Sequence, residues 1–242
     1  MVTLEVCVDD AAGLRVAQRS GVARIELCSA LSVGGLTPSV GLMRLASKSL
    51  TPIYVMIRPR SGDFVFSLDE EAQMLADIET ARELGLAGAV LGACREDHTL
   101  DVPLLRRLSA ACGTMGRTLH RVFDLVPNPR QALEEAVSLG FERILSSGQQ
   151  TKATEGAALL RDLQCWAAGR VEIMAGSGVT PQNVGALVRG SGVCAVHASC
   201  RGVKRPYPEA VTRLGFGEAY ALTDAQVIGA MAEALRDAMR PG

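Results

Sequence analysis

Eight short runs of apolar, strand-forming residues recur along the chain, each three to six residues long. Runs of this kind, bounded by glycine and polar residues, are typical of buried strands in a parallel sheet. They cover residues 4–8, 24–27, 53–58, 88–91, 118–120, 143–146, 171–175 and 194–197.

The stretches between these runs carry the start and stop signals of helices. Thr37-Pro38, Asn128-Pro129 and Thr180-Pro181 each place an N-cap residue before a proline at the first helical position. Segments 67–70 and 223–226, Ser-Leu-Asp-Glu and Thr-Asp-Ala-Gln, are interpreted as capping boxes. The glycines expected to end helical stretches a few residues before the next strand are Gly21, Gly85, Gly140, Gly169 and Gly190.

The repeating unit is therefore strand, loop, helix, glycine, strand. Eight such units in 242 residues are typical of an α/β fold in which a parallel (β/α)8 barrel, the TIM barrel, is ringed by helices. An open, doubly wound sheet is the alternative. We expect the barrel, as a single domain over residues 1–242, because the units are similar in length and no break in composition marks a reversal of strand order.

Two of the strands repeat one chemical pattern, Glu5-Val6-Cys7 and Glu26-Leu27-Cys28. Because side chains alternate between the two faces of a strand, each Glu shares a face with the Cys two residues further on. The apolar Val6 and Leu27 then face the helices, so the Glu and Cys side chains are expected to point into the barrel. The same count places inside the barrel Met56, Arg58, Thr118, His120, Glu172, Met174, Ala195 and His197.

Such an interior would be crowded with ionisable groups, in which three glutamates are offset by one arginine and two histidines. Perturbed pKa values in a cluster of this kind are the usual condition for acid–base catalysis near neutral pH. Alternatively, the groups only neutralise one another, or the strand phase is shifted by one residue and they face solvent. The candidate catalytic residues are Glu5, Glu26, Arg58, His120, Asp124 and His197.

Glycine-containing loops follow two of the late strands. Gly176, Ser177 and Gly178 lie between the seventh strand and a helix start, where backbone N–H groups favour an anion and where barrels often hold phosphate. Ser147 and Gly148, after the sixth strand, are expected to add donors to the same anion. A tight turn that needs glycine for its dihedral angles is the alternative interpretation.

Long loops follow the second, third and eighth strands, at residues 29–36, 59–66 and 201–222. Arg58 and Arg60 flank the start of the second of these loops, and two guanidinium groups suit a carboxylate or a phosphate, unless they are simply solvated. The third loop is interpreted as a mobile lid or as a surface excursion.

Cys7 and Cys28 are candidate ligands of a soft metal ion such as Cu(I), since neighbouring strands run about 5 Å apart. An inward-facing methionine could add a ligand for copper, and inward-facing histidines could complete a zinc site. Alternatively, the two cysteines are small packing residues, because Cys is among the most often buried residue types.

Composition narrows the classes of partner. Basic and acidic residues number 25 and 26, for a formal net charge of -1, so we expect neither a nucleic acid nor a membrane as partner but a metal ion or a small anionic molecule. The seven cysteines include no Cys-x-x-Cys pair, which indicates reduced thiols. With no signal peptide or membrane span evident, we expect a cytoplasmic protein. We also expect a homo-oligomer, and no organic cofactor.

Ten stretches, taken together, form a recognisable set of motifs: Leu4-Glu5-Val6-Cys7, Ile25-Glu26-Leu27-Cys28, Gly34-Gly35-Leu36-Thr37-Pro38-Ser39, Ile57-Arg58-Pro59-Arg60, Gly62-Asp63-Phe64, His120-Arg121, Phe123-Asp124, Ser147-Gly148-Gln149, Met174-Ala175-Gly176 and Val196-His197. By these motifs the chain resembles the CutC copper-homeostasis family over nearly its whole length. Two differences concern its loops: Ser61 replaces a glycine that is common in the family, and Lys204-Arg205-Pro206-Tyr207-Pro208 replaces a Met-Arg-Tyr-Arg-like or Lys-Phe-Arg-like segment.

The resemblance implies a TIM-type barrel, a cytoplasmic protein and an association with copper handling, with Cys7 and Cys28 at the positions where copper would bind. The leading hypothesis is therefore a copper-binding protein of this family. The alternative is an enzyme that moves protons on a small anionic or phosphorylated metabolite, since a copper carrier has no need of inward-facing Glu, Arg and His.

Overall fold

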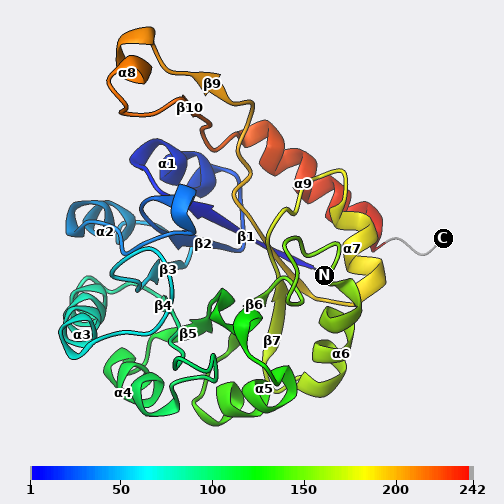
Figure 1. The fold of residues 1–242 in the computed structure, drawn as a ribbon. Helices are drawn as coiled ribbons and strands as arrows, with labels where there is room; N and C mark the ends of the chain where they lie inside the picture. Colours follow the sequence, from blue (N-terminus) through cyan, green and yellow to red (C-terminus); the bar gives the residue numbers. More distant parts are fainter. Residues whose placement is uncertain (1, 240–242) are drawn as a thin grey trace.

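Eight parallel strands close into a barrel in a computed structural model of the chain, which describes residues 2–239 (Figure 1). Neighbouring strands pair in sequence order, and the last pairs with the first, so the predicted (β/α)8 barrel is confirmed and the open sheet is excluded. The predicted domain ends, residues 1 and 242, lie outside the described residues. The strands are β1 (Thr3–Val8), β2 (Arg24–Leu27), β3 (Ile53–Met56), β4 (Gly88–Leu91), β5 (Gly116–Leu119), β6 (Arg143–Ser146), β7 (Glu172–Ala175) and β8 (Ala195–Ala198).

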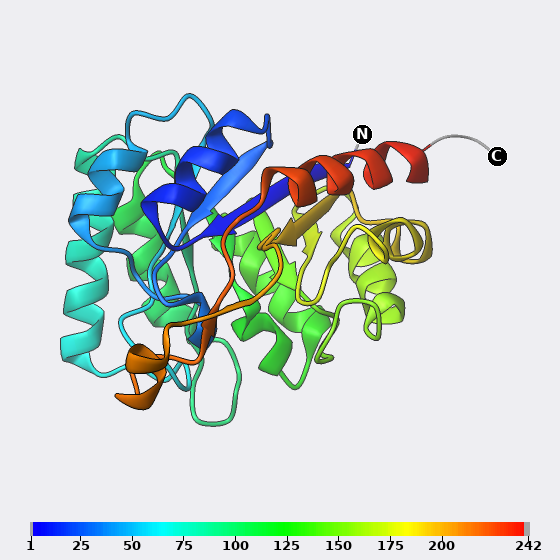
Figure 2. The same cartoon turned by 90° about the horizontal axis from the view of Figure 1, so that it is seen from above.

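Helices surround the barrel, and the last of them packs against both α1 and α7 and so closes the ring (Figure 2). Two short 3-10 helices, Leu31–Val33 (η1) and Arg121–Leu125 (η2), follow β2 and β5. No helix within residues 2–239 is both long and apolar enough to cross a membrane. The α-helices of the ring are α1 (Ala11–Arg19), α2 (Val40–Ala46), α3 (Leu68–Glu83), α4 (Val102–Cys112), α5 (Pro129–Ser138), α6 (Ala157–Ala167), α7 (Val184–Ser191) and α9 (Ala225–Ala238).

Several of the predicted helix signals are confirmed. Ser67 caps α3 in a complete capping box with Glu70, and Asn128 caps α5 with a proline at the first position. Four of the five predicted stop glycines follow directly on the end of a helix and have positive φ angles, which L-residues rarely adopt. These four are Gly21, Gly85, Gly140 and Gly169.

Other signals were wrong by a few residues. The N-cap of α2 is Ser39 and not Thr37, whose hydroxyl instead accepts a hydrogen bond from the Arg58 N–H at 2.9 Å. Helix α7 begins only at Val184, because the Thr180 N–H donates to the side chain of Asn183 and a turn comes first.

The structure also departs from the predicted capping box at 223–226 and from the predicted helix stop at Gly190. The carboxylate of Asp224 caps α9 by accepting from the Gln226 N–H, so segment 223–226 forms no capping box. Gly190 lies within α7, which ends at Gly192 with a φ of 73°. Local side-chain competition for backbone N–H groups thus decides where these helices begin.

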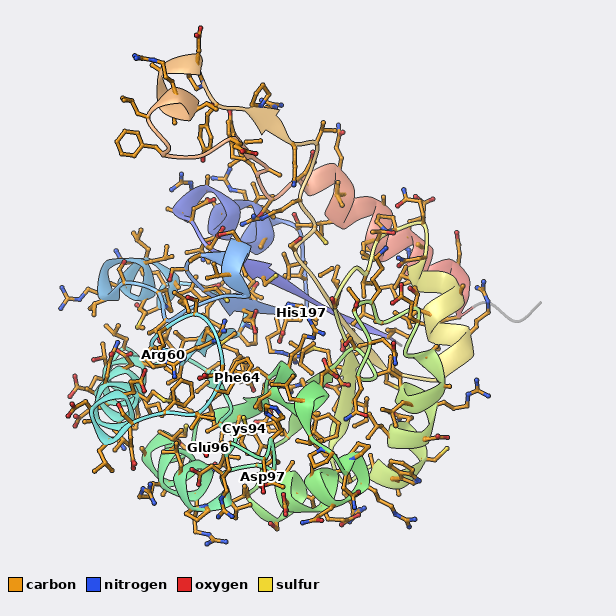
Figure 3. The ribbon with its side chains drawn as sticks, in the orientation of Figure 1. Arg60, Phe64, Cys94, Glu96, Asp97 and His197 are labelled. Atoms are coloured by element: carbon orange, nitrogen blue, oxygen red, sulfur yellow. The ribbon has the colours of Figure 1, made fainter. Side chains whose placement is uncertain are left out.

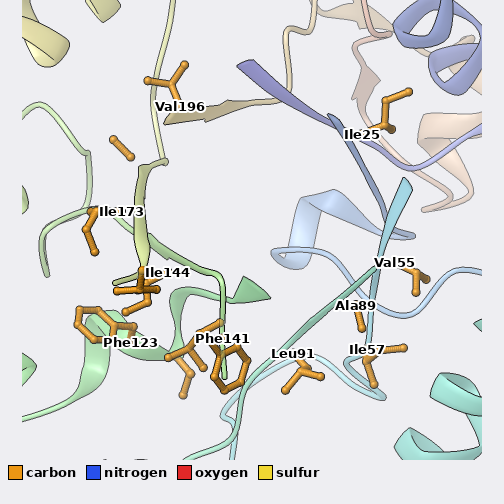
Figure 4. Packing of buried hydrophobic residues seen from close by; sticks show 14 of the residues in the cluster. Ile25, Val55, Ile57, Ala89, Leu91, Phe123, Phe141, Ile144, Ile173 and Val196 are labelled. Atoms are coloured by element: carbon orange, nitrogen blue, oxygen red, sulfur yellow. The ribbon is translucent and has the colours of Figure 1, made fainter. Parts of the chain in front are cut away.

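The main core lies between the barrel and the helices. Val6, Ile25, Leu27 and Ile144 are completely buried there, and Figure 4 shows this layer with Ile25, Ile144 and their neighbours labelled. The predicted strand phase is confirmed, because Val6 and Leu27 face the helices. The alternate residues of each strand are left to fill the barrel interior.

Segment 201–222 forms a small extension of its own. Its strands β9 (Arg205–Pro206) and β10 (Ala219–Tyr220) pair in antiparallel fashion on either side of α8 (Glu209–Arg213). The extension projects outward from the ring of helices beside α1 and α9 (Figure 1). Of the two interpretations of segment 201–222, a mobile lid or a surface excursion, this shape matches the surface excursion.

Candidate functional site

A cavity of about 530 Å³ opens at the carboxyl ends of the strands. His197 and Phe64, two of the residues that line it, lie near the centre of the ring of strands (Figure 3). Polar side chains from strands far apart in sequence thus meet where the barrel fold places active sites. The candidate residues that line the cavity are Cys7, Glu26, Arg58, His120, Ser177, Gly178 and His197; those that do not line it are Glu5, Cys28, Asp124, Ser147, Gly148 and Gly176.

Three potential metal ligands converge at the opening of this cavity, which we call the mouth of the barrel. Cys7, Glu26 and His197 each offer one ligand atom, and the three atoms lie within 4.8 Å of one another. The barrel register explains the grouping, because Cys7 stands opposite Glu26 in the β1–β2 pair. His197 stands opposite Glu5, one inward position below Cys7. A thiol, an imidazole and a carboxylate suit copper or zinc.

His197 is held from below by Glu5. Its Nδ1 atom lies 2.9 Å from Glu5 Oε1, and Arg24 forms an ion pair with the other carboxylate oxygen. Burial alone would raise the pKa of Glu5, but the hydrogen bond and charge of His197 and the charge of Arg24 outweigh it and lower this pKa to about 2. Glu5 is therefore ionised and acts on the mouth through His197 without lining it.

The imidazole of His197 is charged as a consequence. Burial opposes the imidazolium, yet interactions with Cys7 and Glu26 and the hydrogen bond to Glu5 raise the pKa of His197 well above its usual value. Burial also raises the pKa of Glu26, an effect that the charge of His197 offsets in part. The mouth thus places two groups with perturbed pKa values side by side, with His197 Nε2 3.6 Å from Glu26 Oε2.

Cys28 lies beside this group and is not one of the three. Its thiol is 3.3 Å from Glu26 Oε2, to which it donates, and it packs against Tyr54, Met56 and Val90. Burial and the charge of Glu26 raise the pKa of Cys28 well above its usual value. The two thiols do not face each other across the β1–β2 pair, since the register sets Cys7 opposite Glu26, two residues before Cys28.

Below the mouth, the barrel is filled by a chain of ion pairs that sequence reasoning largely missed. Arg143 bonds to Glu172 Oε2 at 2.5 Å and to Glu142 Oε2 at 3.1 Å. The ring of Tyr54 lies within 5.3 Å of the guanidinium of Arg24 and 5.1 Å of that of Arg143. Arg24, Tyr54 and Arg143 share the strand phase of the predicted inward residues, so the alternation count could have found them.

Arg58 and His120 form the opposite wall of the cavity. Arg58 Nη1 donates to the Val33 carbonyl at 2.9 Å, and its Nη2 donates to that of Gly62 at 2.8 Å, so it ties two loops together. The Nδ1 atom of His120 accepts from the Val122 N–H at 3.2 Å. Burial, followed by the charge of Arg58, lowers the pKa of His120 to about 3, so this imidazole is neutral.

Asp124 serves a neighbouring loop. Its carboxylate accepts from the Ser146 hydroxyl at 2.6 Å, from the Ser147 N–H at 3.0 Å and from the Arg121 Nε at 2.7 Å. Asp124 thus occupies the place that an external anion would take at this loop. Gly148 packs directly on the backbone of Gly156, where an added Cβ would lie 2.2 Å from the carbonyl oxygen.

The loop after β7 reaches the cavity in part. Ser177 and Gly178 line it, with φ angles of 82° and 67°. Gly176 lies beneath His197, where a Cβ would come within 2.5 Å of Leu145 Cδ1 and 3.3 Å of His197 Cβ. The loop therefore uses its first glycine for close packing and presents the next two residues to the cavity.

Fold and site together define a parallel (β/α)8-barrel protein with a Cys, a Glu and a His at its mouth. The sequence model of the CutC family matches residues 2–202, and the chain belongs to this family, which confirms the resemblance found in its motifs. The matched region ends at residue 202, shortly before β9. The matched range includes Cys7, Glu26 and His197.

Two relatives and one solved structure are similar to this chain over most of their own length. A CutC family protein of Agrobacterium fabrum is 52% identical over 214 residues, which cover 88% of this chain and 85% of that protein. A human protein named copper homeostasis protein cutC homolog is 44% identical over 202 residues, covering 83% and 74%. The crystal structure of the putative copper homeostasis protein CutC from Streptococcus agalactiae superposes with a TM-score of 0.79 at 32% identity, covering 82% of this chain and 99% of that one.

Proposed function

We propose that this chain is a copper homeostasis protein that binds Cu(I) at the mouth of the barrel through Cys7, His197 and Glu26. The observation that carries the proposal is the approach of the three ligand atoms to within 4.8 Å of one another. A thiolate and an imidazole are ligands that copper favours. The Oε1 atom of Glu26 is buried with no hydrogen-bond partner in residues 2–239, which leaves it available to a cation.

The name of the human relative supports the same role. That protein is named for copper homeostasis and is 44% identical to this chain. The pairing of Cys7 with Cys28 stays a competing prediction for the ligand set. In our proposal Cys28 acts indirectly, because its thiol donates to Glu26 and so holds that carboxylate beside the metal.

Titration of the reduced, metal-free protein with Cu(I), in competition with a chromogenic chelator, tests the proposal. We expect one copper ion per chain in the wild type and a loss of affinity of about tenfold or more in Cys7→Ser, since a ligand bond is removed. The exposed Cys165 offers a matched control, and Cys165→Ser is expected to bind as the wild type does.

The two ligand sets give different results in Cys28→Ser. If Cys28 acts only through Glu26, this variant keeps one-to-one binding, and X-ray absorption of the wild-type complex shows one sulfur neighbour per copper. Two sulfur neighbours, with equal losses in both variants, would establish the thiolate pair instead. Wild-type protein that takes up no copper, or Cys7→Ser protein that binds as tightly, would overturn the copper proposal altogether.

A second candidate function is an enzyme that uses acid–base chemistry on a small anionic or phosphorylated metabolite. The contacts of His197 favour it: Nδ1 is hydrogen-bonded to Glu5, and Nε2 lies 3.6 Å from Glu26 Oε2, which sets a charged imidazole beside a carboxylate of raised pKa at the edge of a cavity. Turnover that is lost in His197→Gln but kept in metal-free protein would support this function.

A cytoplasmic location and a homo-oligomeric state complete the proposal. Seven scattered cysteines without a Cys-x-x-Cys pair favour a reducing compartment. Exposed Val203, Leu214 and Phe216 on the extension give a second copy an apolar surface to contact. Fractionation of cells and light scattering of the purified protein measure these two properties.

A further inference from the structure

Arg58 is a buried cation that no carboxylate of the described residues contacts directly. Only 5% of its surface is exposed, and it donates to the backbone carbonyls of Val33, Gly35 and Gly62 but forms no ion pair with any carboxylate in residues 2–239. The two other buried arginines, Arg24 and Arg143, both pair with glutamates. The nearby carboxylate of Asp63 is bonded to Arg60 at 2.8 Å. Because a buried charge without a bonded partner is costly, the position of Arg58 calls for a further negative group.

Two N–H groups at the same cavity have no acceptor. Arg58 Nε and His120 Nε2 are buried atoms without a hydrogen-bond partner in the described residues, and both side chains line the mouth. Since Nδ1 of His120 accepts from the Val122 N–H, the ring proton resides on Nε2, which is therefore a donor. Buried donors of this kind are normally satisfied, and here a ligand would satisfy them.

The positions of both groups are fixed by packing. The ring of Phe64 lies 4.7 Å from the guanidinium carbon of Arg58 and 4.8 Å, centroid to centroid, from the ring of His120. Gly92 leaves room for His120, because a Cβ there would lie 2.6 Å from its Cε1 atom. The two donors are thus preorganised, which is how a binding site differs from a pair of flexible surface groups.

The charge at this wall amounts to one positive unit. Neutral His120 adds a donor without a charge, and the guanidinium of Arg121, which also lines the cavity, is already paired with Asp124 at 2.7 Å. A monoanion would therefore balance the wall, whereas a phosphate dianion would bring in an excess negative charge close to Glu26. Val33, Met56 and Leu145 give the cavity apolar sides that suit an organic ligand.

We propose that the mouth of the barrel binds a small organic monocarboxylate, whose oxygens accept from Arg58 Nε and His120 Nε2. This site is separate from the ligand set of Cys7, Glu26 and His197 and does not depend on copper. It defines the chemical class of a ligand that the protein takes up whether it carries a metal or acts as an enzyme.

Binding is measured by calorimetry and by ¹⁵N–¹H NMR on metal-free protein, with acetate, lactate, pyruvate and benzoate as monocarboxylates. Lactamide is the uncharged analogue of lactate, and inorganic phosphate is the dianion. We expect at least one monocarboxylate to bind, with shifts at residues around Arg58 and His120, and lactamide and phosphate to bind about tenfold more weakly or not at all.

Two variants each remove one of the two unpaired donors, and Arg58→Lys also replaces the guanidinium that donates to Val33, Gly35 and Gly62. His120→Asn keeps an oxygen to accept from the Val122 N–H but lacks the Nε2 donor, and Arg58→Lys keeps the charge but lacks Nε. We expect each to weaken carboxylate binding by about tenfold or more. Arg60→Lys is the control from the same loop, because Arg60 already pairs with Asp63 and Glu70, and it is expected to bind as the wild type does.

Unchanged thermal unfolding of the ligand-free variants shows that a loss of binding is not a loss of fold, and NMR spectra of the wild type carry the test if a variant does not fold. The proposal is overturned if no monocarboxylate binds, if lactamide binds as well as lactate, or if the shifts lie away from Arg58 and His120. Carboxylate binding that persists in Cys7→Ser separates this result from the outcome of the copper titration.

Discussion

Glu5 Oε1 and His197 Nδ1 lie 2.9 Å apart at the centre of the barrel, on the paired strands β1 and β8. This contact fixes which ring nitrogen of His197 faces the mouth, because a carboxylate on Nδ1 leaves Nε2 toward Glu26. In metal sites, such a carboxylate commonly orients a histidine ligand. Glu5 is thereby a positioning residue for the mouth under either candidate function.

Glu5→Gln is expected to lower the free energy of unfolding by about 3 kcal/mol, because it removes the charge that offsets buried Arg24 and His197. Urea unfolding at neutral pH measures the loss. Glu134→Gln, which breaks an exposed pair with Arg170, is the control and should change the free energy of unfolding far less. Equal effects of the two substitutions would contradict the buried network.

The same variant has a predicted pH signature. Since the pKa of Glu5 is lowered from 4.5 to about 2 in the folded chain, its contribution is fully present above pH 4.5 and is lost as the pH falls toward 2. Acid unfolding of Glu5→Gln should lack this part of the pH dependence. Parallel curves for the two proteins between these pH values would rule out the assignment.

His120 also makes the stability of the protein fall as the pH is lowered, in a second pH range. Its pKa falls from 6.5 to about 3 on folding, so the unfolded chain binds a proton that the folded chain does not, and stability is lost as the pH falls from 6.5 toward 3. Between pH 6.5 and pH 5 this amounts to about 2 kcal/mol. Urea unfolding of His120→Asn at these two pH values should show a difference smaller by that amount, and an unchanged difference would refute a neutral buried His120.

The sequence was sufficient for the barrel and for the phase of its strands. Alternation in segments such as Glu5-Val6-Cys7 depends only on the two faces of a strand, so it places Val6 toward the helices and its neighbours inside without knowledge of the fold. The same count, carried to the first residue of the second and sixth predicted strands, would have added Arg24 and Arg143.

The relative heights of the side chains could not be predicted in this way. Whether Cys7 stands opposite Glu26 or Cys28 depends on the stagger of β1 against β2, and closure of all eight strands sets that stagger. The role of Asp124 is likewise tertiary, because its partner Ser147 is 23 residues away in sequence and comes from the loop after β6.

Asp124→Asn tests this tertiary role. An amide in place of the carboxylate sets its own N–H donors against those of Ser147 and Gln149, so we expect a loss of about 2 kcal/mol in the free energy of unfolding. The exposed Asp162 on α6 provides the control, and Asp162→Asn is expected to change stability by no more than about 0.5 kcal/mol. Similar values for the two variants would show that the loop does not depend on Asp124.

Tyr54 on β3 stands opposite Gly88 on β4. Their contact predicts that a single methyl group added at Gly88 strongly lowers the stability of the protein. A Cβ at Gly88 would lie 2.2 Å from Tyr54 Cε1. The Tyr54 ring cannot move away freely, because the guanidinium groups of Arg24 and Arg143 contact it. Gly88→Ala is therefore expected to destabilise the protein by about 3 kcal/mol in urea unfolding, through overpacking of the barrel interior.

A second substitution shows whether the ring is the cause. If it is, Tyr54→Leu destabilises the wild type but restores part of the stability of Gly88→Ala, so the two changes are not additive. Gly229→Ala in the exposed part of α9, where a Cβ has no neighbour within 4 Å, should instead raise stability by up to about 1 kcal/mol. Additive losses in the double variant would mean that the strain at Gly88 comes from the backbone and not from the aromatic ring between the two arginines.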